Sequence, residues 1–167
     1  MDFFSQLHPK LVHFPIAFFF LYTLLECIYA ATEKSFFSKS AQMLLILGMI
    51  SSVAALLTGE QAASAATEIL DSAKNAANPE IRALIDSHNS SATALVWFFT
   101  FLSVYRSWYF IQTVVKNKPP EKSKVIRISF VILALTGCYF LYMTHHEGGR
   151  LVYEHGVGSE LFKQHLK

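Results

Sequence analysis

The sequence predicts an all-α fold: an integral membrane four-helix bundle with both termini on the outer side of the membrane. Hydrophobic residues make up 53% of the 167 residues, and the mean hydropathy is +0.35, well above that of an average soluble protein. Crossing a hydrocarbon core takes about 20 helical residues. Four apolar segments are long enough: residues 11–31, 41–59, 92–115 and 125–144. Backbone in lipid must satisfy its own hydrogen bonds, so these segments are expected to be helices.

The orientation follows from basic residues in two short loops. The loop 32–40 carries Lys34 and Lys39, and the loop 116–124 carries four lysines followed by Arg127. The long connection 60–90 is mainly acidic. Because Lys and Arg in short loops mark the cytoplasmic side, we expect both termini and residues 60–90 to lie outside.

The chain is expected to form a single membrane domain without an internal repeat. Its helices are predicted at about 9–31, 41–59, 91–115 and 125–146. Residues 60–90 are interpreted as an outer loop with two short surface helices, and residues 147–167 as a re-entrant or capping segment. The first apolar run exceeds the 7–15 residues typical of a signal peptide, so it is expected to be a retained helix.

Histidines gather at the outer ends of the predicted helices. His8 and His13 open the first helix, His88 precedes the third, and four follow or end the fourth: His145, His146, His155 and His165. An imidazole at the edge of hydrocarbon is costly unless it is hydrogen-bonded or bound to a metal. Any one of them could simply form hydrogen bonds at the wet interface. The set as a whole indicates a functional site.

Prolines and glycines flank these histidines. Pro9 suits the first position of a helix, whereas Pro15 removes a hydrogen bond to the Leu11 carbonyl and predicts a bend around His13. At the other end of the chain, the pair Gly148 and Gly149 is expected to end the fourth helix. The later glycines, at 156 and 158, would let the chain return tightly onto the bundle.

These motifs resemble those of a known family. The stretches "HPKLVHFPIA" (8–17), "LLTG" (56–59), His88 and "GGRLVYEHGVG" (148–158) are similar to the bacterial four-helix membrane proteins called domain of unknown function 2231. The similarity covers nearly the whole chain. Members often occur with, or fused to, cytochrome c-type modules, so the resemblance implies respiratory electron transfer in the bacterial inner (cytoplasmic) membrane. Four histidines match the family motifs: His8, His13, His88 and His155.

The first functional hypothesis is a b-type haem protein, or a subunit of a respiratory or cytochrome complex, that transfers electrons at the outer, periplasmic side. Haem iron takes two axial imidazoles, and histidines on facing helices can hold the porphyrin between them. The four motif histidines would bind one or two haems, in a pairing left open, with His145 and His146 as secondary ligands. Candidate apolar walls and propionate partners are Phe14, Phe18, Tyr153, Arg150, Arg82 and Lys10. Covalent haem is excluded, because Cys27 and Cys138 form no CxxCH motif.

Two alternatives remain open at this stage. The same histidines could bind zinc or copper with Glu147, Glu154 or Asp86. Alternatively, the chain is a structural membrane subunit without a cofactor. No catalytic residue is identified, so the chain by itself is interpreted as a carrier or subunit, and its status as an enzyme stays open.

The expected partners are membrane lipid and a cytochrome c-type or quinone-linked redox protein, within a larger complex. Nucleic-acid binding is not expected, because the net charge of +2 is accounted for by the basic loops.

One pair of charges lies deeper in the predicted spans. Glu26 and Arg106 should be at similar depth, near the cytoplasmic interface. The sequence favours independent snorkelling of each side chain to the headgroups over an ion pair. A proton-linked or quinone-linked site is the functional alternative, in which Glu26→Gln would impair proton-coupled turnover.

Overall fold

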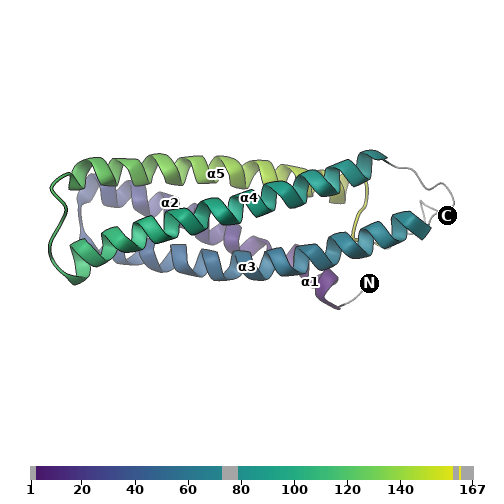
Figure 1. Cartoon of the computed structure of the whole chain (residues 1–167), viewed down its shortest axis with the longest axis horizontal. Helices are drawn as coiled ribbons and strands as arrows, with labels where there is room; N and C mark the ends of the chain where they lie inside the picture. Colours follow the sequence, from purple (N-terminus) through teal and green to yellow (C-terminus); the bar gives the residue numbers. More distant parts are fainter. Residues whose placement is uncertain (1–2, 73–78, 160–161, 163–167) are drawn as a thin grey trace.

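The computed structural model describes residues 3–72, 79–159 and 162. Their helices are α1 (Phe3–Leu11), α2 (His13–Thr32), α3 (Ser35–Ser72), α4 (Pro79–Phe110), a π-helical turn (Ile111–Val115) and α5 (Ser123–Tyr153). Figure 1 shows four long rods side by side, with the short α1 at the start of the first. Both α2 and α4 pack against α3 and α5. Four helical spans are long and apolar enough to cross a membrane, which confirms the all-α four-helix prediction.

The first rod is interrupted at one residue, Val12, close to where Pro15 predicts a bend. α1 ends at Leu11 and α2 begins at His13, since Pro15 has no N–H to donate to Leu11. Val12 keeps right-handed helical angles, with φ −60° and ψ −24°, and its N–H donates to His8 O at 3.1 Å. The helix begins earlier than expected, however. Pro9 lies inside α1 and is not the first helical residue.

The expected outer loop 60–90 is mostly a continuation of the membrane helices. α3 runs for 38 residues, about 57 Å, and α4 begins at Pro79, a residue suited to the first turn. The two short surface helices expected here are therefore extensions of α3 and α4, which project beyond the other helices (Figure 1). The Ala-rich sequence of this segment favours helix.

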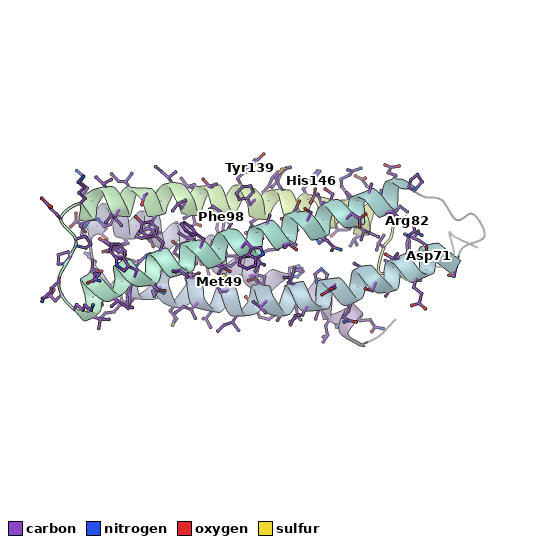
Figure 2. The ribbon with its side chains drawn as sticks, in the orientation of Figure 1. Met49, Asp71, Arg82, Phe98, Tyr139 and His146 are labelled. Atoms are coloured by element: carbon purple, nitrogen blue, oxygen red, sulfur yellow. The ribbon has the colours of Figure 1, made fainter. Side chains whose placement is uncertain are left out.

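A second, smaller core holds the two extensions together. It is formed by buried apolar residues from α3, α4 and the C-terminal segment: Ala66, Leu70, Ile81, Leu84, Ile85, Leu151 and Phe162. An ion pair between Arg82 and Asp71 joins the tips of α4 and α3 (Figure 2). The return of the C-terminal segment onto the bundle, expected from its glycines, is thus observed.

The glycine pair at 148 and 149 does not end the last helix. α5 continues to Tyr153 and closes with Gly156 at a φ of 67°. Gly156 N–H donates to Val152 O at 3.0 Å, which is the bond of an αL cap with Gly156 as its left-handed residue. Val157 N–H also donates, to Leu151 O at 2.9 Å. The helix stop therefore belongs to the second glycine pair.

The main core has stacked phenylalanines at its centre. The rings of Phe19 on α2 and Phe99 on α4 have centroids 3.7 Å apart and planes 6° apart. Each ring lies against a glycine of the neighbouring helix. An added Cβ would meet Phe19 Cε1 at 2.5 Å from Gly48, and Phe99 Cζ at 2.6 Å from Gly137. Only glycine leaves room for the stack at these two positions.

Glu26 and Arg106 form an ion pair in the bundle interior, so the prediction of independent snorkelling was wrong. Both residues are 0% exposed, and Arg106 Nε donates to Glu26 Oε2 at 3.0 Å. Arg106 Nη2 also donates to Ser38 Oγ at 3.1 Å. The guanidinium lies over the rings of Tyr29, Tyr109 and Phe130, within 5.8 Å of each centroid. Aromatic faces and mutual charge compensate the loss of water.

Candidate functional site

The end of the bundle where α1 begins and α5 finishes is called the histidine end here, because it carries His8 and His88. These two rings come from helices 80 positions apart in the sequence. Their centroids are 6.4 Å apart and their planes 75° apart. Of the histidines in the described part of the chain, they are the two whose rings contact each other.

His8 is fixed by α3. Its Nδ1 lies 3.0 Å from the carbonyl oxygen of Ala55 and 3.4 Å from Thr58 Oγ1. Because a carbonyl only accepts, the Nδ1 carries the proton and donates it. Gly59, on the next turn of α3, gives the ring its place, since an added Cβ there would lie 2.9 Å from His8 Cε1.

His88 is fixed by α5 in the same way. Its Nδ1 lies 3.1 Å from the carbonyl oxygen of Thr144 and donates to it. Gly148, one turn further along α5, makes room for the ring, because an added Cβ would lie 3.0 Å from His88 Cε1. Ser87 donates to Glu147 Oε1 at 2.6 Å and ties the same two helices together.

This arrangement leaves both imidazoles equipped as metal ligands. A neutral ring that donates from Nδ1 has its lone pair on Nε2. Histidines that bind a metal through one ring nitrogen commonly donate a hydrogen bond from the other nitrogen to a carbonyl. Neither Nε2 has a hydrogen-bond partner among the described residues. Two imidazoles in trans on one metal, with bonds of about 2 Å, would have ring centroids about 6.3 Å apart. The observed spacing of 6.4 Å is close to this value.

The other two motif histidines lie apart from this pair. His13 is exposed at the first residue of α2. His155 follows α5, with its Nε2 4.0 Å from the carboxylate of Glu154. Neither makes a ring contact with His8 or His88 in the part of the chain that the structure describes. Of the four predicted ligands, the structure brings two together.

The secondary candidates are placed on the surface. His145 and His146 are exposed on α5, and Figure 2 shows His146 on the outside of the bundle near Tyr139. The ring of His146 contacts Tyr142, with centroids 6.1 Å apart. His165 lies outside the described residues.

Among the described residues, no hydrogen bond, ion pair or ring contact joins the predicted walls and propionate partners to His8 or His88. Phe14 is 54% exposed and Tyr153 is 89% exposed, so both face outward; Phe14 makes a ring contact with Phe18. Arg150 Nε donates to Glu154 at 3.0 Å, and Arg82 pairs with Asp71. Lys10 is exposed on α1.

A groove of about 480 Å³ opens between α3 and α4 just beyond the histidine pair. Its walls carry four carboxylates: Glu60, Glu68, Asp71 and Asp86. Glu60 directly follows Gly59, so the groove begins one residue from the glycine that seats His8. The described residues contain no group of three or more His, Cys, Asp or Glu side chains arranged to hold a metal ion.

Sequence reasoning missed the two glycines and the two carbonyl acceptors. The dipeptide Thr58–Gly59 is too short to stand out, and Gly148 was expected to stop a helix. A signal was present in the spacing, because each acceptor carbonyl lies four residues before the glycine that faces the same ring. The spacing can be interpreted only when it is known which helix packs against which.

Comparison with known proteins gives one family. Residues 5–161 match the family model DUF2231, described as a predicted membrane protein. No curated protein matches the chain, and no solved structure matches it.

Proposed function

The chain belongs to the DUF2231 family of predicted membrane proteins, and we propose that it is a membrane-bound b-type haem electron-transfer protein or the haem-bearing subunit of a respiratory complex. His8 and His88 would hold the haem iron through their Nε2 atoms. The two rings together would serve one haem per chain.

The paired geometry of His8 and His88 is the main support for a haem site. Two rings from different helices are 6.4 Å apart and each donates from Nδ1 to a backbone carbonyl. Both rings are half-buried, and an imidazole that donates from Nδ1 has its Nε2 lone pair available for a haem iron.

The chain's own residues have distinct tasks in this proposal. Ala55 and Thr144 hold the Nδ1 protons and so set the tautomer and orientation of the rings. α1 to α5 exclude bulk water from one side of the site. Haem, when bound, supplies an iron that gains and loses one electron.

The location and partners of the site are part of the proposal. Positive loops at the opposite end of the bundle favour a histidine end on the periplasmic side of the inner membrane. An electron carrier there would exchange electrons with a cytochrome c-type or quinone-linked protein. The open carboxylate-lined groove beside the site supports a partner with a basic surface.

The test is purification in mild detergent followed by spectra of the oxidised and dithionite-reduced protein. A pyridine-haemochrome assay and elemental analysis on the same sample give the amounts of haem and metal. We expect a low-spin Soret band, a sharp reduced α band and one haem per chain. His8→Ala and His88→Ala should each abolish the low-spin spectrum, whereas His13→Ala and His146→Ala should leave it unchanged.

The other outcomes identify the alternatives. A colourless protein containing zinc or copper would replace haem with a non-haem metal site. A metal-free protein that also fails to bind added haem would leave a structural membrane subunit. Haem retained in both His8→Ala and His88→Ala would refute this ligand pair.

A further inference from the structure

The bundle can be divided into two helix pairs, called halves here: α1 and α2 with α3, and α4 with α5. The first helix of each half carries a histidine, a phenylalanine and a tyrosine at the same spacing. Phe19 lies 11 residues after His8, and Phe99 lies 11 residues after His88. These phenylalanines stack on each other, and the histidines contact each other. At these positions, adding 80 to a residue number of α1 or α2 therefore gives the equivalent residue of α4. Tyr29 corresponds to Tyr109, and both are buried.

The second helix of each half repeats in the same way, with an offset of 89. Gly48 faces Phe19 as Gly137 faces Phe99. Gly59 faces His8 as Gly148 faces His88, and the acceptor carbonyl lies four residues before the glycine in both halves. Each half uses its own second helix to hold its own histidine and phenylalanine.

The burial pattern follows the same two offsets. With side chains sorted as buried, half-buried or exposed, residues 11–30 and 91–110 agree at seventeen of twenty positions. Residues 37–53 and 126–142 agree at fifteen of seventeen. Equivalent positions therefore face equivalent surroundings within these two windows, beyond the residues that happen to be identical. The agreement does not extend to the histidine end, where residues 54–63 and 143–152 agree at two of ten positions.

We infer that the bundle consists of two copies of one helix-pair unit, and that each copy contributes an equivalent half of a single ligand site between His8 and His88. Gly59 and Gly148 are its matched positioning residues. The first helices run in the same direction, so the halves are related by an approximate two-fold axis along the bundle, as in parallel repeats of membrane proteins. A ligand on that axis would be held by one imidazole from each half. The identity of this ligand rests on the haem proposal; the repeat does not.

The repeat corrects the expectation that the chain has none. Few residues need to be identical for two helix pairs to pack alike, because lipid-facing positions accept any apolar side chain. The copies also differ where they meet in the interior. Glu26 and Arg106 each lie 18 residues after their histidine, so equivalent positions carry opposite charges and pair across the axis.

The experiment uses alanine substitutions at the two positioning glycines in the full-length protein. Gly59→Ala and Gly148→Ala should each lower the Tm of the haem-free protein by about 5 °C, because the new Cβ displaces the imidazole. Each should also reduce bound haem several-fold and to a similar extent. Gly149→Ala is the matched control, since its Cβ would have its nearest neighbour at 3.9 Å; it should change neither.

Double variants test whether each glycine serves the histidine of its own half. Gly59→Ala combined with His8→Ala should recover most of the lost Tm, because the crowded ring is gone, whereas Gly59→Ala with His88→Ala should not. The mirror set, Gly148→Ala with His88→Ala or His8→Ala, should behave identically. Recovery across halves, or no coupling within them, would overturn the inference.

The haem-free and haem-bound measurements separate the two proposals. Coupling within halves in a protein that never binds haem would support the repeat and end the haem proposal. Haem binding that is unaffected by both glycine variants would leave the haem proposal standing and overturn the positioning role.

Discussion

At the scale of single residues, the buried ion pair of Glu26 and Arg106 is the main feature of the bundle interior. Glu26 and Arg106 satisfy each other in a fully buried setting, while Glu26 Oε1 and Arg106 Nη1 have no hydrogen-bond partner there. Removing one partner of a buried pair leaves an unpaired charge in the interior, and the resulting loss of stability exceeds what the intact pair contributes. The interior of the bundle therefore depends on both residues together.

Replacing Arg106 alone should unfold the bundle readily. Arg106→Met leaves the Glu26 carboxylate buried without a counter-charge and should reduce the free energy of unfolding by about 3–5 kcal/mol. Thermal and denaturant unfolding in detergent measures this. Adding Glu26→Leu should restore part of the stability, because no buried charge remains. Arg127→Met is the control, since Arg127 pairs with the largely exposed Glu33; an equal loss there would contradict the argument.

At the scale of elements, the start of the first rod determines where His8 lies. Residues five apart in a helix, such as His8 and His13, point about 140° from each other, and in the structure His13 is exposed while His8 contacts α3. α1 packs against α3, where the carbonyl of Ala55 accepts the hydrogen bond from His8 Nδ1. Pro15 weakens the helix between the two histidines, because it cannot donate to the Leu11 carbonyl.

Restoring helical continuity should disrupt the site. In Pro15→Ala the new N–H can donate to the Leu11 carbonyl, so α1 and α2 should join and carry His8 away from Ala55. We expect stronger amide hydrogen-exchange protection at residues 12–16 and a several-fold loss of bound haem. Pro9→Ala, which leaves the break intact, should retain haem. A Pro15→Ala protein with unchanged protection would show that packing on α3 alone sets the kink.

At the scale of the whole molecule, charge is distributed along the bundle axis. The end opposite the histidines carries Lys34, Lys39 and the lysines of the α4–α5 connection, while carboxylates line the groove at the histidine end. Figure 1 shows α1 and the end of α5 at the histidine end of the bundle. Such asymmetry sets the direction in which membrane helices insert.

Cysteine labelling should place the two ends on opposite sides of the membrane. In a background with Cys27 and Cys138 replaced by alanine, Asp86→Cys should react with a membrane-impermeant thiol reagent in intact spheroplasts. Lys118→Cys should react only after lysis. Both positions are exposed, so access depends on the side alone. The reverse pattern would put the histidine end in the cytoplasm and exclude periplasmic redox partners.

Sequence alone predicts the fold class, the four spans, the interruption of the first helix before Pro15 and the set of histidines that includes the candidate pair. Each of these depends on local composition or on residues a few positions apart, such as hydropathy over about 20 residues or the missing N–H of a proline.

The three-dimensional structure was needed to show which histidines meet, that Glu26 pairs with Arg106, that α3 and α4 extend past the bundle, and that four glycines make room for rings. The contacts among them join residues about 30 to 80 positions apart, so they depend on how each helix is rotated and where it crosses its neighbours. A sequence pattern says which face of a helix is apolar or polar. It does not say which helix that face will contact.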